Sequence, residues 1–364
     1  MVCDTLCAHQ RSRGPLISIT DIKEISMTRN RLAFALAAVL LGFAVLIAVS
    51  AGRYPIALST LGRLFLSLLG VQDQSLLLAE PALVLWSVRM PRILMAIMTG
   101  AALSVSGVIF QGLFRNPLVS PAILGVTSGA NFGAALALLL WGSSIMILEA
   151  SAFIWGLIAV GITYQIGKRG DSSVTTLVLA GVIVSSLFVA GLSYIKCKAD
   201  PYGQLPAIVF WTMGSFNSVS WADAARGGVL ISFGLAATHL LRWGLNPMAL
   251  GDEEALSLGV DVSQKRAGYI LIATLMVSAA TASCGSIGWV GLVIPHMARI
   301  IVGADHDVLV PFSALLGGLF MLSMDTLART LPGGEIPVGI LTAIIGAPCF
   351  GYLLINNKQN GWNN

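Results

Sequence analysis

The sequence predicts an all-α polytopic membrane protein with ten transmembrane helices. Of its 364 residues, 56% are hydrophobic and only 10% are charged, and the mean hydropathy is +0.85. A soluble domain of this length needs a charged surface that this composition does not supply. Long apolar runs recur between short charged turns. At roughly 20 residues per span, ten spans use about 200 residues and leave no room for a large soluble domain.

Ten apolar segments are assigned as spans in chain order. The first has 20 residues without a charge, whereas the apolar core of a signal peptide has about 7–15. The other segments are bounded by charged, proline or glycine residues. The ten ranges are 32–51, 93–113, 121–141, 145–166, 174–195, 227–241, 267–284, 287–302, 308–324 and 336–355.

Two shorter helices and two tails complete the predicted organisation. Residues 61–69 are interpreted as a short interfacial helix, and residues 205–216 as a re-entrant or interfacial helix. Residues 1–31 are expected to form a cytoplasmic, disordered tail, whose first 26 residues are either a true tail or an over-extended translation start. Residues 32–356 form the transmembrane domain, and residues 357–364 form a cytoplasmic C-terminal tail.

The distribution of basic residues predicts the orientation. Ten spans place both termini on one side of the membrane. Of the 21 Lys and Arg residues, 13 then fall on the side of the termini and 8 on the other side. The positive-inside rule therefore places the termini, and with them residues 245–262, in the cytoplasm. Without the first 26 residues the difference shrinks to 10 against 8.

Several function classes have no motif in this chain. There is no GxxxxGK[ST] phosphate-binding loop, so any ATP that drives the protein is bound by another chain. No Ser/His/Asp or HExxH arrangement is present, and we expect no catalytic residue. The five cysteines are scattered without a CxxC pair, which predicts neither a disulfide framework nor a metal site. The net charge of +4 is interpreted as a topology signal and not as a nucleic-acid surface.

Residues 245–262 stand out because Asp252, Glu253 and Glu254 follow one another between apolar runs. We predict two short helices that are broken at Gly251. One interpretation is an ordinary helix at the membrane surface. The alternative is a handle by which a partner outside the membrane moves the spans on either side.

The ends of these two helices carry typical capping residues. Asn246 can cap the first helix, with Pro247 at its first position, where a missing N–H costs little. Asp252 can cap the second helix, and Gly259 is a natural stop. The apolar residues available for docking are Ala249, Leu250, Ala255, Leu256 and Leu258.

Two arginines, Arg89 and Arg92, stand at the predicted outer mouth of the second span, and Arg329 is placed on the same face by topology. Arginine binds carboxylates through two parallel hydrogen bonds. These cations can therefore receive an acidic partner, if they are exposed. The alternative is that they only anchor the helix at the interface.

Hydroxyl side chains open the fifth span from the cytoplasmic side. They can line a gate, or they can be ordinary helix caps. The residues are Ser172, Ser173, Thr175 and Thr176.

Two other patterns are interpreted as structural. Gly125, Gly129 and Gly133 are spaced for close helix packing. His296 and Arg299 are interpreted as a helix-end pair, with a proton relay as the alternative.

A proton- or sodium-coupled carrier usually needs a buried carboxylate. Glu149 is the only acid inside an assigned span, where it lies in the first turn, and Asp325 follows the ninth span. This scarcity argues against a secondary transporter. An intramembrane enzyme is the third class considered, and it lacks a catalytic pair.

Taken together, the motifs closely resemble the FecCD-type permeases of bacterial ABC importers, over roughly residues 32–356. The first 26 residues match nothing in that family, and Met90 stands where leucine is usual. The motifs are Arg89-Met-Pro-Arg92; Thr99-Gly-Ala-Ala-Leu; Gln111-Gly-Leu-Phe-Arg-Asn-Pro-Leu118; Leu124-Gly-Val-Thr-Ser-Gly129; Leu179-Ala-Gly-Val182; Trp211-Thr-Met-Gly-Ser-Phe216; Ala249-Leu-Gly-Asp-Glu253 with Leu258-Gly259; Gly288-Trp-Val-Gly-Leu-Val-Ile-Pro-His-Met-Ala-Arg299; Pro311 with Ser313; and Glu335-Ile-Pro-Val-Gly339 with Gly346-Ala-Pro348.

The resemblance implies the permease architecture of type II importers, with ten helices per subunit, in the bacterial inner membrane. It implies a second permease subunit, expected to be identical, and two copies of an ATP-binding cassette subunit that carry the ATP and Mg²⁺. No cofactor or metal is expected on this chain. A periplasmic or lipoprotein substrate-binding protein would deliver the substrate, an iron–siderophore or alternatively haem, cobalamin, molybdate or tungstate.

The resemblance also implies roles for residues. Arg89, Arg92 and Arg329 match arginines that receive acidic residues of the binding protein. The fifth and tenth spans and residues 205–216 would line a pathway with few charges, so specificity would lie in the binding protein. The cytoplasmic gate loop is matched by Ser172, Ser173, Val174 and Thr175. The ATPase-coupling helices are matched by Ala249, Leu250, Gly251, Asp252, Glu253, Glu254, Leu258 and Gly259.

Overall fold

The structure is a computed structural model that describes residues 19–68, 75, 79–142, 144–170 and 173–356. Within these ranges every regular element is a helix. The predictions for Ser172 and for residues 357–364 lie outside the described part of the chain, as do those for residues 1–18.

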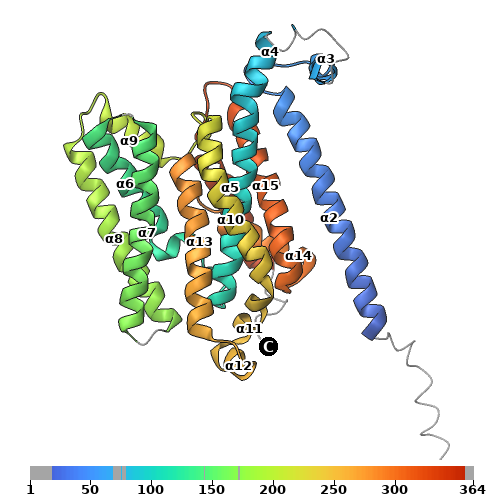
Figure 1. The fold of residues 1–364 in the computed structure, drawn as a ribbon, viewed down its shortest axis with the longest axis vertical. Helices are drawn as coiled ribbons and strands as arrows, with labels where there is room; N and C mark the ends of the chain where they lie inside the picture. Colours follow the sequence, from blue (N-terminus) through green and yellow to red (C-terminus); the bar gives the residue numbers. More distant parts are fainter. Residues whose placement is uncertain (1–18, 69–74, 76–78, 143, 171–172, 357–364) are drawn as a thin grey trace, which may run out of the picture.

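Seven helices are long and apolar enough to cross a membrane, and the short α4 and the π-helix η3 extend one of them, α5, at its start (Figure 1). They are α2 (Ile19–Ser50), α4 (Glu80–Leu83) with η3 (Val84–Arg89) and α5 (Met90–Leu113), α7 (Ile145–Arg169), α8 (Val174–Lys198), α10 (Trp221–Leu241), α13 (Val262–Cys284) and α15 (His306–Thr330). The chain is therefore an all-helical membrane protein of several spans.

The predicted third, eighth and tenth spans are shorter apolar helices. They are α6 (Val126–Trp141), α14 (Val290–Val302) and α16 (Val338–Asn356). At about 1.5 Å per residue, the 13 residues of α14 rise about 20 Å, less than the hydrocarbon core of roughly 30 Å. The number of complete membrane crossings therefore remains a prediction.

Small helices occupy the two ends of the molecule. Figure 1 shows α3 and α4 at one end, called here the α3 end, and α11 and α12 at the opposite end, called the elbow end. The remaining elements are α3 (Leu58–Leu68), α9 (Gln204–Thr212), α11 (Leu245–Leu250), α12 (Asp252–Ser257) and the 3₁₀ turns η4 (Pro121–Leu124) and η5 (Arg242–Gly244).

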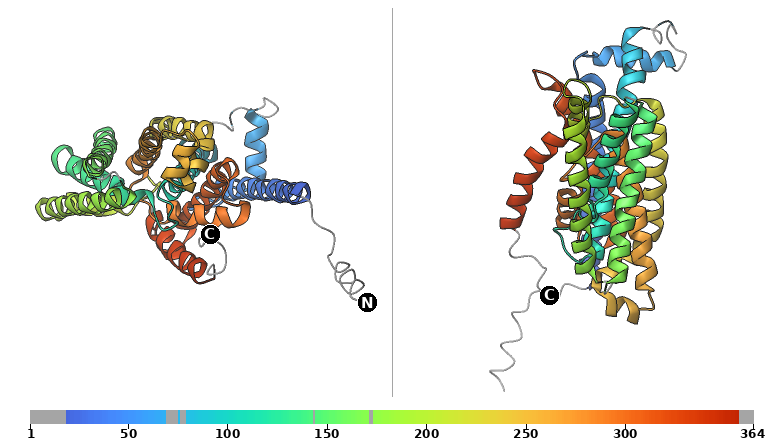
Figure 2. Two further views of the ribbon diagram at one scale, coloured as in Figure 1. Left: turned by 90° about the horizontal axis from the view of Figure 1, so that it is seen from below. Right: turned by 90° about the vertical axis from the view of Figure 1, so that its left-hand side faces the viewer.

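Helix α5 is the centre of the fold. It packs against α10, α13, α14 and α15, and α2 lies against α15 at the outside of this group (Figure 1). Helices α6, α7 and α8 form a second group, joined to the first mainly by α13. Helix α16 stands off from the rest of the bundle, as the right-hand view of Figure 2 shows. Apolar side chains such as Leu36, Phe233 and Leu240 face outward, as expected for a surface in contact with lipid.

Pairs of glycines set the spacing of α5 against its neighbours. A Cβ atom on Gly100 would lie 2.1 Å from the carbonyl oxygen of Gly317 on α15. Seven residues on, a Cβ atom on Gly107 would lie 2.0 Å from the carbonyl oxygen of Gly291 on α14. Backbones meet directly at both points, which is how small residues support helix packing in membranes.

The structural interpretation of the glycines on α6 is confirmed. Cβ atoms on Gly129 and Gly133 would each lie 2.5 Å from a carbonyl oxygen of α7. Gly125 has a φ of +86° and ends the 3₁₀ turn η4 before α6 begins. These three glycines therefore serve packing and chain direction.

Replacing Gly107 with alanine is expected to destabilise the protein by about 1–3 kcal/mol, because the added methyl group forces α5 and α14 apart. Thermal unfolding of the purified protein in detergent measures this effect. Gly268→Ala on α13 is the matched control, since nothing lies within 4 Å of its Cβ position. An unchanged midpoint for Gly107→Ala would contradict the close approach of the two helices.

The second span begins earlier than predicted, because one continuous helical segment covers Glu80–Leu113. The π-helix η3 accommodates Pro91, which has no N–H to donate. The N–H of Met90 bonds to the carbonyl of Leu85, five residues back. In the same pattern the next carbonyl, that of Trp86, would be bonded by residue 91, but Pro91 has no N–H. The carbonyl of Trp86 accepts the indole N–H of Trp221 at 2.7 Å instead. Arg89 and Arg92 consequently lie inside a helix and not at its mouth.

The predicted boundary of the N-terminal tail is also wrong. Helix α2 begins at Ile19, well before residue 32, and its apolar membrane-crossing part is Met27–Ser50. Charged residues before the apolar run do not break a helix, and neither proline nor glycine occurs between residues 16 and 41. The helix therefore continues out of the apolar segment.

Candidate coupling elbow and arginine network

Residues 245–262, called here the elbow, form two short helices that meet at Gly251. Gly251 has φ 148° and ψ 166°, a conformation that residues with a side chain rarely adopt. Gly259 has φ +79°, and the N–H of the next residue, Val260, bonds back to Ala255 at 3.0 Å. The predicted break and the predicted stop are both confirmed.

The predicted caps of the elbow are wrong. Helix α11 begins one residue before Asn246, whose side-chain oxygen instead accepts the backbone N–H of His306 at 2.9 Å. Helix α12 follows Gly251, and Asp252 makes no cap. Its carboxylate accepts both hydrogen bonds from one nitrogen of Arg266 on α13, at 2.6 and 2.7 Å. These side chains fasten the elbow to its neighbouring helices.

The space around Gly251 is filled by charged groups. A Cβ atom at this position would lie 2.2 Å from a carboxylate oxygen of Glu254 and 3.1 Å from a guanidinium nitrogen of Arg115. Arg115 follows the end of α5, so the elbow is in contact with the central helix of the fold. Any side chain at 251 would disturb both the backbone and this contact.

The elbow has a buried face and an exposed face. Leu245, Met248 and Ala255 are buried against the bundle. On the other face Leu250, Leu256 and Leu258 are 63%, 60% and 62% exposed, and the side chains of Glu253 and Glu254 are exposed beside them. An exposed patch of leucines with two carboxylates at the end of a membrane bundle is typical of a protein-binding surface.

Two cavities flank the elbow. One of about 520 Å³ lies between α11 and the end of α5, and its lining includes Arg115, Leu250, Arg299 and His306. Another of about 330 Å³ separates α12 from the start of α8 and the end of α7, with Asp252 and Leu177 on its walls. The elbow is therefore not closely packed against the spans at these two places.

Of the predicted gate residues, Ser173, Val174 and Thr175 are described, and they come just before Leu177, which lines the second cavity. Ser173 caps α8, since its hydroxyl accepts the backbone N–H of Thr176 at 3.2 Å. Val174 begins the helix and Thr175 follows. The capping interpretation is confirmed for Ser173, and it does not exclude a gate, which remains a prediction.

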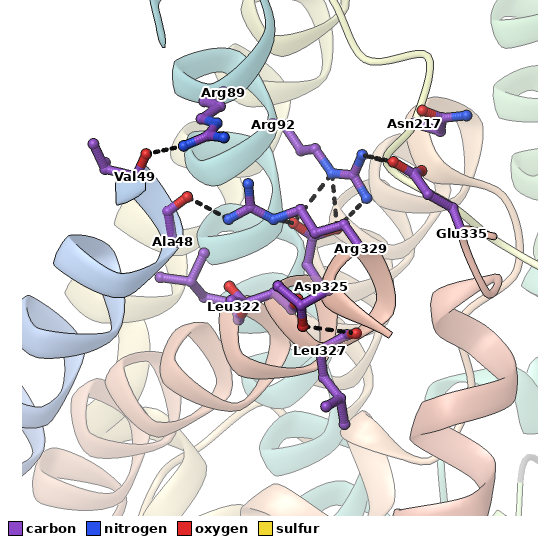
Figure 3. A network of polar contacts seen from close by, with 12 residues as sticks. Ala48, Val49, Arg89, Arg92, Asn217, Leu322, Asp325, Leu327, Arg329 and Glu335 are labelled. Atoms are coloured by element: carbon purple, nitrogen blue, oxygen red, sulfur yellow. Dashed lines mark hydrogen bonds and ion pairs between the residues drawn. The ribbon is translucent and has the colours of Figure 1, made fainter. Parts of the chain in front are cut away.

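At the α3 end, the three predicted docking arginines form one buried network (Figure 3). Arg89, Arg92 and Arg329 are only 4%, 5% and 6% exposed. Arg89 donates to the carbonyls of Val49 and Tyr54, and Arg329 donates to the carbonyl of Ala48. The expectation of an exposed arginine face is therefore wrong in this structure, because the end of α2 covers two of the guanidinium groups.

Arg92 is neutralised inside the protein by two carboxylates. Its Nε donates to Asp325 at 2.9 Å, and its Nη1 donates to both oxygens of Glu335 at 3.2 Å (Figure 3). Asp325 is fully buried and also lies 3.7 Å from Arg329. Because α15 continues to Thr330, Asp325 lies inside a span, contrary to the predicted end of that span at residue 324.

The buried acids are paired, and this bears on the carrier hypothesis. Glu149 accepts a hydrogen bond from Arg226 at 3.0 Å, and Asp325 is held by Arg92. A proton- or sodium-coupled carrier needs a carboxylate that can exchange its ion. The described spans also hold Asp223, which is buried on α10 and is likewise paired with Arg226. These three acids are occupied by arginine, so the argument against a secondary transporter holds although Asp223 and Asp325 had not been assigned to a span.

A model of the FecCD transport family matches residues 39–356. The chain belongs to the FecCD transport family. Members of this family are permease subunits of ABC transporters and not enzymes themselves. This FecCD-family chain is accordingly a transport subunit.

Two similar curated proteins and one solved structure cover most of this FecCD-family chain. A molybdate import system permease protein of Haemophilus influenzae is 40% identical over 333 residues, which are 89% of this chain and 95% of that protein. A hemin transport system permease protein of Yersinia pestis is 38% identical and covers 75% of this chain and 83% of its own length. An ABC transporter assigned to the metal-chelate type, solved in an inward-facing conformation, has a TM-score of 0.80 and 38% identity, covering 89% of this chain and 99% of its own.

Proposed function

We propose that this chain is the membrane-spanning subunit of an ATP-driven importer that carries an iron–siderophore or a similar metal complex into the cytoplasm by alternating access. The observation that carries the proposal is the elbow. It presents leucines and glutamates away from the bundle, while its own fold is fixed by Gly251 and by the ion pair of Asp252 with Arg266. A surface of this kind can bind a separate protein whose movement is transmitted to the spans.

The elbow is proposed to sit in a cleft of the ATP-binding cassette subunit. The contact residues are Ala249, Leu250, Gly251, Asp252, Glu253, Glu254, Leu258 and Gly259. Movement of the elbow would be transmitted to α5 through the contact of Gly251 with Arg115. It would also change the smaller cavity, which α12 shares with the start of α8. Ser172, Ser173, Val174 and Thr175 would form the gate that this movement opens or closes.

The complete assembly is proposed to contain two permease subunits with ten spans each and two ATPase subunits that hold ATP and Mg²⁺. The elbow end and both termini would face the cytoplasm of a bacterial cell across its inner membrane. The α3 end would then face outward and receive a periplasmic or lipoprotein binding protein. The apolar faces of α8 and α16, which include Leu187 and Ile344, would line the pathway beside the second subunit.

Docking of the binding protein is proposed to involve Arg89, Arg92 and Arg329. In the structure Arg92 is already paired with Asp325 and Glu335. A docking carboxylate would therefore have to displace Glu335, whose side chain is 19% exposed, while the fully buried Asp325 stays in place.

A second substrate class, molybdate, is favoured by one observation. The molybdate permease of Haemophilus influenzae matches over 95% of its length, whereas a hemin permease matches over 83%. Haem and cobalamin belong with the iron–siderophores to the class of metal complexes. Tungstate is an alternative to molybdate, because it has the same charge and shape.

The substrate is tested on the cognate substrate-binding protein. Isothermal titration with a ferric siderophore, haemin, cyanocobalamin and molybdate in parallel identifies the ligand. Uptake of that ligand into proteoliposomes holding the permease, its ATPase and internal ATP then tests the function. We expect uptake only with ATP and with the ATPase present. Uptake driven by an ion gradient without the ATPase would refute the proposed function.

A further inference from the structure

The larger of the two cavities beside the elbow has the chemistry of an anion site. Its volume is about 520 Å³, and the end of α5, the elbow, the end of α14 and the start of α15 meet around it. Arg115, Arg299 and His306 lie on its walls, and none of its lining residues is an acid. Most of the other lining residues are apolar, with Trp243 and Leu250 among them. The cavity is large enough for a small molecule or a lipid headgroup.

The two arginines supply the positive charge of this cavity. Arg299 donates to the side-chain oxygen of Gln111 at 3.2 Å, and both side chains line the cavity. Arg115 is exposed, and within the described residues its side chain makes neither a salt bridge nor a hydrogen bond. The carboxylate of Glu254 faces Gly251 near Arg115, but it is not on the cavity wall. Two guanidinium groups therefore line the cavity, and an oxyanion is the ligand that balances them.

His306 adds a second requirement, because one of its ring nitrogens has no partner. The residue is only 3% exposed, and Nε2 makes no hydrogen bond within the described part of the chain. The amide nitrogen of Asn246 donates to the carboxylate of Asp305 at 2.9 Å, so its amide oxygen faces Nδ1 of His306, at 2.7 Å. Nδ1 is consequently the donor of the neutral ring, and Nε2 is an acceptor that lacks a donor.

The wall next to this nitrogen carries no side chain. A Cβ atom on Gly112, which also lines the cavity, would lie 2.9 Å from Nε2 of His306. A ligand that satisfies the whole site therefore has negatively charged oxygens for the arginines and a hydroxyl group for Nε2.

We propose that this cavity binds a hydroxyl-bearing phosphate, either free hydrogen phosphate or the headgroup of phosphatidylglycerol. Arg115 and Arg299 hold the charged oxygens, and Nε2 of His306 accepts a hydrogen bond from the hydroxyl group. Basic pockets between transmembrane helices at the cytoplasmic side are suited to phospholipid headgroups, and the elbow end is the proposed cytoplasmic end. The ligand would join the ends of α5 and α14 to the elbow. It is a ligand of this chain itself, so the proposal does not require the ATPase.

Sulfate separates the two parts of the site, because at neutral pH it has the charge of the ligand but no hydroxyl group. The first experiment titrates the purified full-length protein, in nanodiscs of phosphatidylcholine, with inorganic phosphate and with sulfate. The readout is tryptophan fluorescence, since Trp243 lies on the cavity wall, and Trp243→Phe should remove the response. We expect a saturable response, with sulfate binding about fivefold more weakly than phosphate for lack of one hydrogen bond.

The lipid source has its own measurement. Nanodiscs that contain phosphatidylglycerol are compared with those of phosphatidylcholine alone, and native mass spectrometry of the released protein counts the retained lipid. If the headgroup is the natural ligand, phosphatidylglycerol is retained and prevents the response to inorganic phosphate. If free phosphate is the ligand, the response is the same in both kinds of nanodisc.

Variants of the cavity wall test whether binding occurs there. We expect Arg115→Gln to weaken binding of both anions about tenfold, since a charged donor is lost. His306→Phe should lower the affinity for phosphate to that for sulfate. Ala304 is an exposed wall residue, so Ala304→Glu places a carboxylate in the cavity without touching the histidine. This variant should block binding, whereas Ala304→Gln, which has the same shape without the charge, should bind normally.

Binding of phosphate or retention of phosphatidylglycerol that is lost in Arg115→Gln and Ala304→Glu, and kept in Ala304→Gln, supports the proposal. Absence of both kinds of binding in the wild type, or equal binding in all variants, overturns it. Equal affinities of the wild type for phosphate and sulfate would overturn the role of His306. The proposed transport function does not depend on any of these results.

Discussion

Replacing Gly251 with alanine is expected to abolish ATP-driven uptake while the protein still inserts and folds. The glycine holds a φ of 148°, which strains any residue with a side chain. The added methyl group would also meet the carboxylate of Glu254 at 2.2 Å. The two short helices would then meet at a different angle and no longer fit the ATPase. Uptake into proteoliposomes and the ATPase rate of the assembled complex measure the loss.

Two further variants sharpen this prediction. Gly268→Ala on α13 is the control, because Gly268 lies outside the elbow and nothing lies within 4 Å of its Cβ position. We expect normal uptake for that control. Glu253→Lys should abolish uptake by reversing a charge on the exposed face, with no effect on folding. Normal uptake in both Gly251→Ala and Glu253→Lys would refute the coupling assignment.

Replacing Asp325 with alanine is expected to destabilise the protein by about 3–5 kcal/mol, the usual cost of removing one partner of a buried ion pair. Asp325 is fully buried, and its loss leaves Arg92 with Glu335 as its only carboxylate. The guanidinium of Arg329 also loses its neighbouring charge. A lowered midpoint of thermal unfolding and a lower yield of folded protein in the membrane measure the effect.

The controls for Asp325 use the same network. Glu335→Gln should cost no more than about 1 kcal/mol, because this side chain reaches solvent and Arg92 keeps its buried partner. The double variant Arg92→Gln with Asp325→Asn should be more stable than Asp325→Ala, because no unpaired charge is left in that pair. A midpoint of Asp325→Ala equal to that of the wild type would show that the ion pair does not stabilise the fold.

The existence of most helices was predictable from the apolar runs, but their ends were not. Helix α15 continues past residue 324 because Asp325 and Arg329, the charged residues of this last stretch, are held inside the protein. The partner of Asp325, Arg92, is 233 residues away in the sequence. A charged residue is costly inside a span when it faces lipid. The sequence pattern does not show which charged residues pair inside the protein and so avoid this cost.

The elbow illustrates the same limit at a smaller scale. The local backbone was predictable, because the break at Gly251 and the stop at Gly259 depend on the conformational freedom of glycine. The roles of Asn246 and Asp252 were not, because their partners come from α15 and α13. A tertiary hydrogen bond replaced a local cap in both cases.

The most direct test of the account is the accessibility of the elbow from each side of the membrane. A single cysteine is placed at position 253 in a variant whose five native cysteines are replaced, and a membrane-impermeant maleimide is added. The account predicts labelling in inverted vesicles, no labelling in intact spheroplasts, and protection of the cysteine once the ATPase subunit is bound. Labelling of the intact spheroplasts would place the elbow outside the cell and would contradict the claim that an ATPase grips it.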